Sequence, residues 1–240
     1  MVAGGWAEMR PEVTVGAGDA FDFYSKDMGD TKSYYYYAYD FRSACVHAQT
    51  LFPIWGFGNA ILRNGPLFSK AADSTSLVQL NGANQYVVFP PSLADIVNIR
   101  VKVRFMVAAS KVQTLFALGS RTNGAFSAVL DGEDKCRVVV ARAKTGETFQ
   151  SAPMNVVRGT WTTLTAQWTS PSNVAVQLNS AASVNLTVAC TMNDLVAPND
   201  WTDANAVYLG RGTAATLQDC FAGSVAFFGV GFCDDTSGWL

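Results

Sequence analysis

The chain has 240 residues, 49% of them hydrophobic, and a formal net charge of −2 from 17 basic and 19 acidic residues. A near-neutral chain has no global positive field for holding phosphates, so general binding of DNA or RNA is disfavoured. With only 15% charged residues and 20 glycines, the composition excludes a disordered polyampholyte and suits many strands joined by tight turns. No apolar run reaches the length of a membrane-spanning helix.

The first 66 residues differ in pattern from the rest and begin without the basic and apolar regions of a secretion signal. Five of the eight tyrosines lie between residues 34 and 39, where their alternation permits a short strand with aromatic side chains on both faces. Such an aromatic segment often needs a partner surface, so we predict an assembly arm over residues 1–66, with an ordinary core or a sugar platform as alternatives. The candidate interface residues are Tyr34, Tyr35, Tyr36, Tyr37, Tyr39, Phe41 and Trp55.

Regular alternation begins after residue 67. The stretch "SLVQLNGANQYVVFP" at 76–90 predicts two strands around an Asn-Gly turn. In "NIRVKVRFMV" at 98–107, apolar residues alternate with Arg100, Lys102 and Arg104. Because neighbouring side chains of a strand point to opposite faces, we expect a buried apolar face and a basic face exposed to solvent.

Two hairpins and a closing strand follow. "FSAVLDGEDKCRVVV" turns at Asp131-Gly132, and "TTLTAQWTSPSNVAVQL" turns at a Ser-Pro-Ser-Asn segment. "FAGSVAFFGVGF" at 221–232 is predicted as a buried strand. Strands recur about every dozen residues without a long amphipathic helix, so we predict an all-β fold, an antiparallel two-sheet jelly-roll sandwich, over residues 67–240.

The order of these pieces resembles the laminin G-like, or concanavalin A-like, jelly roll over roughly residues 68–232. The resemblance implies that the segment near 221–232 runs beside the first strand of the domain. It also implies that loop oxygens at a rim can hold calcium, for which Asp200, Asp203 and Asn205 are the candidates, with a metal-free polar loop as the favoured alternative. The sequence departs from the family in lacking an acidic residue after the closing Gly-x-Val and a histidine near Trp161.

The sequence contains no recognisable catalytic motif and no zinc-binding motif. The single histidine, His47, excludes a His-x-x-x-His site, and there is neither a G-x-S-x-G motif nor a strand of alternating acidic residues as in glycan hydrolases of this class. We therefore expect no enzyme activity and no cofactor. Most of the five cysteines are expected to be buried free thiols, with a bridge from Cys220 to Cys233 as an alternative. The glycosylation sequon at Asn185 is interpreted as the outward face of a strand.

These features favour a non-enzymatic structural or attachment protein, a capsid decoration or tail protein of a virion, assembled in the host cytoplasm as a homo-oligomer or a larger shell. That step from fold to function is an analogy. The alternative is a glycan-binding lectin module of a cell-surface or secreted protein, located outside the cell. A jelly-roll polysaccharide lyase or hydrolase is a minor alternative.

Overall fold

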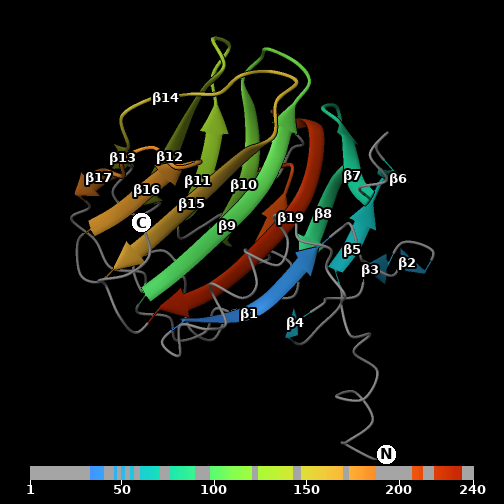
Figure 1. Cartoon of the computed structure of the whole chain (residues 1–240), viewed down its shortest axis with the longest axis horizontal. Coiled ribbons are helices and arrows are strands. Elements are labelled where there is room, and N and C mark those ends of the chain that lie inside the picture. Colours follow the sequence, from blue (N-terminus) through green and yellow to red (C-terminus); the bar gives the residue numbers. More distant parts are fainter. Residues whose placement is uncertain are drawn as a thin grey trace, which may run out of the picture.

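The structure is a computed structural model that describes residues 33–40, 46–47, 50–51, 55–56, 60–70, 76–89, 98–120, 124–142, 147–169, 173–187, 207–212 and 219–233. Every regular element in these residues is a β-strand, and the strands form two antiparallel sheets that face each other (Figure 1). The predicted all-β two-sheet sandwich is therefore confirmed. No helix in the described part of the chain could cross a membrane.

Sheet A lies toward the viewer in Figure 1 and contains most of the long strands. Its order is β17-β16-β15-β9-β19-β1-β4, and β6 and β7 extend it beside one half of β19. Its strands are β1 (Ser33–Asp40), β4 (Trp55–Gly56), β6 (Leu67–Lys70), β7 (Ser76–Asn81), β9 (Asn98–Val107), β15 (Thr162–Thr169), β16 (Asn173–Leu178), β17 (Val184–Thr187) and β19 (Ala222–Cys233).

Sheet B forms the second layer, with the order β13-β12-β11-β10-β18-β8-β5-β3-β2 and with β14 paired to β12. Both sheets draw strands from the beginning and the end of the chain. The strands of sheet B are β2 (Val46–His47), β3 (Thr50–Leu51), β5 (Ala60–Arg63), β8 (Tyr86–Phe89), β10 (Gln113–Ser120), β11 (Gly124–Leu130), β12 (Lys135–Arg142), β13 (Thr148–Gln150), β14 (Met154–Asn155) and β18 (Val207–Leu209).

Strand β19 organises sheet A. One of its edges pairs with β9 along most of its length, and its other edge pairs with β7 over residues 222–225 and then with β1 over residues 227–233. Figure 1 shows β9 and β19 as long curved neighbours, with β1 on the far side of β19. The expectation that residues 221–232 run beside the first strand of the domain is confirmed by the pairing of β19 with β7.

The Asn-Gly turn at residues 81–82 carries the chain from one sheet to the other. β7 pairs within sheet A, whereas β8 pairs with β5 and β18 in sheet B. Gly82 has a φ of 73°, which glycine adopts without the steric cost of a side chain. The two predicted strands of 76–90 are thus both present, but they belong to different layers of the sandwich.

The core between the sheets is aromatic. Phe228 of sheet A lies with its ring centroid 4.6 Å from that of Phe89 and 6.2 Å from that of Phe116, both of sheet B. All three side chains are at most 1% exposed. Burying a phenylalanine stabilises a fold by roughly 1.5–3 kcal/mol, so this trio makes a large contribution to holding the layers together. The hairpins β11–β12 and β15–β16 are formed as predicted.

The first 66 residues supply strands to both sheets. The tyrosine run forms β1, as its alternation predicts, and β1 pairs with β19 and β4. Strands β2, β3 and β5 extend sheet B beyond β8. Whether residues 1–66 also act as an assembly arm, separate from a domain at 67–240, stays a prediction.

Candidate functional site

The outward face of sheet A carries mostly polar side chains on four strands, because the registers of these strands bring their polar positions together. Arg100 of β9 pairs with Gln167 of β15, and Lys102 pairs with Thr165. Strand β16, which forms a hairpin with β15, continues these cross-strand pairs, since its Gln177 pairs with Thr165. We call this surface the polar face; its members are Arg100, Lys102, Arg104, Thr163, Thr165, Gln167, Asn173, Ala175, Gln177, Asn185 and Thr187.

Exposure changes across the polar face. Asn185 and Thr187 on β17 are exposed, whereas Gln167 and Arg100 nearer the middle of sheet A are each only 3% exposed. The alternation predicted for residues 98–107 is confirmed, because Val101, Val103, Phe105 and Val107 lie in the core. The expected exposed basic face is wrong for Arg100, which is buried, while Lys102 and Arg104 are half-buried. In the sheet, Arg100 lies between Gln167 of β15 and Gly231 of β19.

Trp161 stands at one end of the polar face, directly before β15. The guanidinium carbon of Arg104 lies 5.7 Å from the centroid of the Trp161 ring. An arginine at this distance over an indole makes a cation–π contact, worth about 0.5–1 kcal/mol at an exposed site and more when desolvated. Both side chains are half-buried. The contact therefore orients an aromatic ring that solvent can still reach.

Backbone hydrogen bonds fix the residues beside Trp161. The Thr163 N–H donates to Asn179 Oδ1 at 2.8 Å, and the Asn179 N–H donates to the Thr163 carbonyl oxygen at 2.7 Å. Asn179 adopts a φ of 53°, a conformation that asparagine tolerates better than most residues. Gln177 donates from Nε2 to the Ala181 carbonyl oxygen at 3.1 Å. The turn after β16 is thereby tied to the strand that begins next to Trp161.

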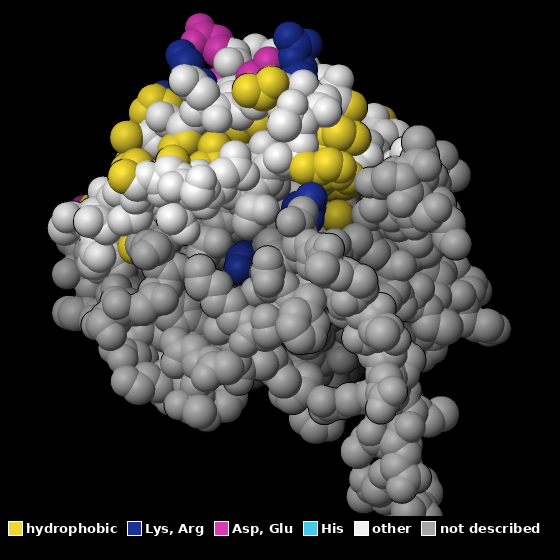
Figure 2. Space-filling model, viewed as in Figure 1, with side chains coloured by type: hydrophobic (Ala, Val, Ile, Leu, Met, Phe, Trp, Pro, Cys, Tyr) yellow, Lys and Arg dark blue, Asp and Glu magenta, His cyan; other side chains and the backbone are white. Residues whose placement is uncertain are grey.

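The chemistry of this surface suits ligands rich in hydroxyl groups. Amide and hydroxyl side chains both donate and accept hydrogen bonds, and an exposed aromatic ring offers a flat apolar surface for stacking. Figure 2, which views the molecule from the side of sheet A, shows a few dark-blue Lys and Arg side chains near the middle of the view, and yellow hydrophobic ones above them. Acidic side chains gather at the upper end of the same view.

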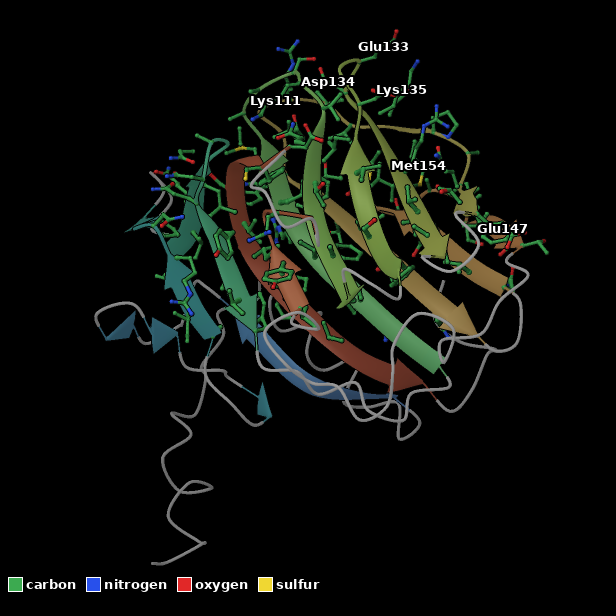
Figure 3. The ribbon with its side chains drawn as sticks, turned by 180° about the vertical axis from the view of Figure 1, so that it is seen from behind. Lys111, Glu133, Asp134, Lys135, Glu147 and Met154 are labelled. Atoms are coloured by element: carbon green, nitrogen blue, oxygen red, sulfur yellow. The ribbon has the colours of Figure 1, made fainter. Side chains whose placement is uncertain are left out.

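The acidic cluster at residues 131–134 is a structural turn. Asp131 Oδ1 accepts the backbone N–H groups of Glu133 at 2.9 Å and of Lys135 at 3.0 Å, and these bonds, that of Lys135 above all, lower the pKa of Asp131. Asp134 pairs with Arg158 at 2.7 Å. Figure 3 places Glu133, Asp134 and Lys135 together at one end of the sandwich. Within the described residues, no group of acidic, histidine or cysteine side chains is arranged to hold a metal.

Most site residues predicted from the sequence are outside the part that the structure describes in full. The calcium candidates Asp200, Asp203 and Asn205 and the interface candidate Phe41 are outside the described residues. The remaining interface candidates are placed as backbone only, in β1 and, for Trp55, in β4. Their roles stay predictions. Asn185 is exposed on β17, as its interpretation as an outward strand residue requires.

The side chains of two of the five cysteines, Cys136 and Cys220, are described, and both are buried free thiols. Burial raises the pKa of Cys136 to about 12, so its thiol is neutral at physiological pH. Burial also raises the pKa of Cys220, although Arg211 and Lys111 oppose the shift. Because Cys220 is a free thiol, the alternative of a bridge between Cys220 and Cys233 is wrong.

Sequence reasoning did not identify Trp161, Gln167 or Gln177 as candidate site residues. Each polar strand of this face does show a signal, since polar and apolar residues alternate in "RVKVRF", "TTLTAQW" and "NVAVQL". The alternation alone separates inward from outward positions. It does not reveal that β9 pairs with β15, and that pairing is what unites the three strands into one surface.

Comparisons with known proteins show the fold. A scan against family models and a search of curated proteins find no match. Among solved structures, domain 4 of AbnA, a GH43 extracellular arabinanase from Geobacillus stearothermophilus solved in complex with arabinotriose, is similar with a TM-score of 0.61 and 15% identity. The similarity covers 84% of this chain and 94% of that domain.

Two further structures have the same kind of sandwich. The CBM40 domain of the Ruminococcus gnavus IT-sialidase, solved bound to α2,3-sialyllactose, has a TM-score of 0.51 and 14% identity over 69% of this chain and 92% of its own. The binding domain of botulinum neurotoxin serotype D has a TM-score of 0.58 and 10% identity. That match covers 86% of this chain but 49% of the toxin domain. At these identities the likeness establishes the β-sandwich fold, while the laminin G-like and virion assignments stay predictions.

Proposed function

We propose that this protein is a carbohydrate-binding domain that binds its ligand on the polar face of sheet A without catalysing a reaction of that ligand. The observation that carries the proposal is the half-buried ring of Trp161, oriented by Arg104 at the end of a surface of amide and hydroxyl side chains. The ring would stack on the apolar face of a sugar, and Thr163 and Gln177 would meet its hydroxyl groups.

The solved structures support the same class of ligand. The AbnA domain is described in complex with arabinotriose, and the sialidase domain is described as bound to α2,3-sialyllactose. The arabinanase is extracellular, which favours the extracellular alternative for this chain. This proposal follows the lectin alternative of the sequence analysis. A role in a virion would use the same binding chemistry and requires separate evidence of assembly.

A glycan microarray that includes arabinotriose and α2,3-sialyllactose tests the proposal, followed by calorimetric titration of the strongest ligand. The wild-type chain should bind at least one glycan. Trp161→Ala should lower the affinity for that glycan by about tenfold or more, because an aromatic side chain that anchors a ligand contributes more than 1 kcal/mol to binding. Trp161→Phe should retain part of the affinity and shows whether the ring itself matters.

Val112→Ala is the matched control, since Val112 is a hydrophobic residue that is 56% exposed in the turn between β9 and β10. Its affinity should equal that of the wild type. Binding should also be unchanged by EDTA, because we propose a site without calcium. Absence of any glycan bound by the folded wild-type chain, or equal affinities of wild type and Trp161→Ala, would contradict the proposal.

A further inference from the structure

We infer that the protein has a second carbohydrate-binding site, formed by the amide side chains around the β7–β8 turn together with Tyr86 of sheet B. We call the group Asn64, Asn81, Asn84 and Gln85 the amide rim. The inference extends the proposed function from one site to two, and it rests on residues that contribute nothing to the polar face of sheet A.

Gln85 anchors the rim to the neighbouring turn after β5. Its Nε2 donates to the carbonyl oxygens of Gly65 at 2.7 Å and of Asn64 at 3.3 Å, and its Oε1 accepts the Asn81 N–H at 2.9 Å. Both ends of this amide are therefore occupied by the backbone. The Gln85 side chain thus joins two turns that lie about 20 residues apart in the chain.

Asn81 and Asn84 fix the rest of the rim. Asn81 Oδ1 accepts the backbone N–H groups of residues 83, 84 and 85, at 2.9, 3.2 and 3.3 Å. Asn81 Nδ2 donates to Asn84 Oδ1 at 3.1 Å, and Asn64 Nδ2 donates to the Asn84 carbonyl oxygen at 2.7 Å. Lys111 adds a hydrogen bond from Nζ to the Gly82 carbonyl oxygen. Figure 3 shows Lys111 at the same end of the sandwich as the turn at residues 131–135.

The rim still offers hydrogen-bonding atoms to a ligand. Asn64 and Asn84 are exposed, and no hydrogen bond to another described residue occupies Asn64 Oδ1 or Asn84 Nδ2. An acceptor and a donor held on adjoining turns match a pair of neighbouring sugar hydroxyls, each of which can donate and accept. Because hydrogen bonds already hold the rim side chains, a ligand would lose little affinity to the ordering of these side chains.

Tyr86 supplies the aromatic part of this site. It follows Gln85 directly, is half-buried, and lies opposite Arg63 on the outward face of sheet B. The guanidinium carbon of Arg211 lies 4.9 Å from the Tyr86 ring centroid and 4.8 Å from that of Tyr208. The two rings also meet edge to face at 6.1 Å. Arg211 and Tyr208 thus hold the Tyr86 ring in one orientation, and its backbone directly follows the rim residue Gln85.

The two sites belong to different layers of the sandwich. Trp161 adjoins β15 of sheet A, whereas Tyr86 begins β8 of sheet B, and the outward faces of the two sheets point away from each other. A domain with two such sites could join two glycan chains or hold one surface with higher avidity than either site alone.

Titration of the full, ¹⁵N-labelled chain followed by NMR tests the inference. The probes are arabinotriose, cellotriose, maltotriose and α2,3-sialyllactose, each raised to roughly 10 mM to detect weak binding. The side-chain amide signals of Asn64 and Asn84 should shift with at least one probe, and the shifts should persist in Trp161→Ala. Rim signals that stay unshifted with all four probes would overturn the inference.

Asn84→Asp is the sharpest variant, because it keeps an oxygen acceptor for Asn81 Nδ2 and replaces the free Nδ2 donor with a second carboxylate oxygen, at the cost of one added negative charge. It should weaken binding at the rim by about tenfold. Gln150→Glu, which makes the same amide-to-carboxylate change at an exposed position on β13, is the matched control and should leave binding unchanged. Rim affinity in Asn84→Asp equal to that of the wild type would also overturn the inference. Shifts at the rim without any shift at Trp161 would support this site and contradict the proposed function of the polar face.

Discussion

Arg104 holds its guanidinium carbon 5.7 Å from the ring centroid of Trp161, and the two residues come from neighbouring segments of sheet A that are more than fifty positions apart in the chain. Thr163, two residues after Trp161, pairs directly with Arg104. The orientation of the aromatic ring therefore depends on the strand pairing of β9 with β15. Carbohydrate affinity and the integrity of this pairing should change together.

Removing the charge of Arg104 should weaken glycan binding without unfolding the protein. Arg104→Met keeps a long side chain but loses the cation–π contact, worth about 0.5–1 kcal/mol, so affinity should fall by roughly two- to fivefold. Arg104→Lys retains a cation and should bind better than Arg104→Met. Calorimetric titration measures both, and thermal unfolding confirms that the variants are folded. If Arg104→Met binds as tightly as the wild type, the contact does not orient the ring for binding.

Gly223 should not tolerate a side chain. A Cβ built at this position would lie 2.2 Å from the Met106 carbonyl oxygen, an atom of the neighbouring strand β9 that cannot move without disturbing the sheet. Gly223→Ala should lower the free energy of unfolding by about 1–3 kcal/mol, as overpacking does. Gly132→Ala is the matched control, because a Cβ there would meet nothing within 4 Å. Urea unfolding of both variants and the wild type measures the change in unfolding free energy. Equal losses of unfolding free energy in Gly223→Ala and Gly132→Ala would contradict the prediction.

Cys136 should make the protein less stable at alkaline pH. Its pKa rises from 9.0 to about 12 on folding, so the unfolded chain loses this proton first as the pH increases. The stabilisation is complete below pH 9 and is lost between about pH 9 and 12. By pH 10 the loss should be on the order of 1 kcal/mol.

Cys136→Val removes this titration and keeps an apolar side chain of similar size. The difference in unfolding free energy between the wild type and Cys136→Val should move by that amount in favour of the variant between pH 7 and pH 10, since all other groups are common to both. Urea unfolding at the two pH values measures it. A difference that is independent of pH would show that Cys136 does not titrate in this way.

Deleting residues 1–66 should destabilise the sandwich. The deletion removes β1, which pairs with β19 at seven positions, and β5, which pairs with β8. The loss of β1 and of β5 leaves unpaired edges on β19 and β8, and unpaired strand edges favour aggregation. A deletion of residues 1–32 keeps both strands and serves as the control. Light scattering and thermal unfolding compare the two. A soluble, folded monomer from the longer deletion would instead support a separable arm.

The alternation of residues in β9, β15, β16 and β19 was sufficient to predict these strands and their inward faces, because side-chain direction along a strand is a local property. Which strands pair with one another could not be predicted from the local sequence pattern. The alternation places Arg100 on the outward face of β9 but does not reveal that its side chain is only 3% exposed. The amide rim lay in a predicted turn, but its bonds to the turn after β5 depend on β5 pairing with β8.

The position of β19 sets the order in which the chain can fold. β1, β7 and β9 all pair with this strand, which ends at Cys233, so sheet A cannot close during synthesis until nearly the whole described chain has left the ribosome. Contacts between such distant segments slow folding, and the waiting strands expose edges that can pair with other chains. Refolding at low protein concentration should accordingly recover more native protein than refolding at high concentration.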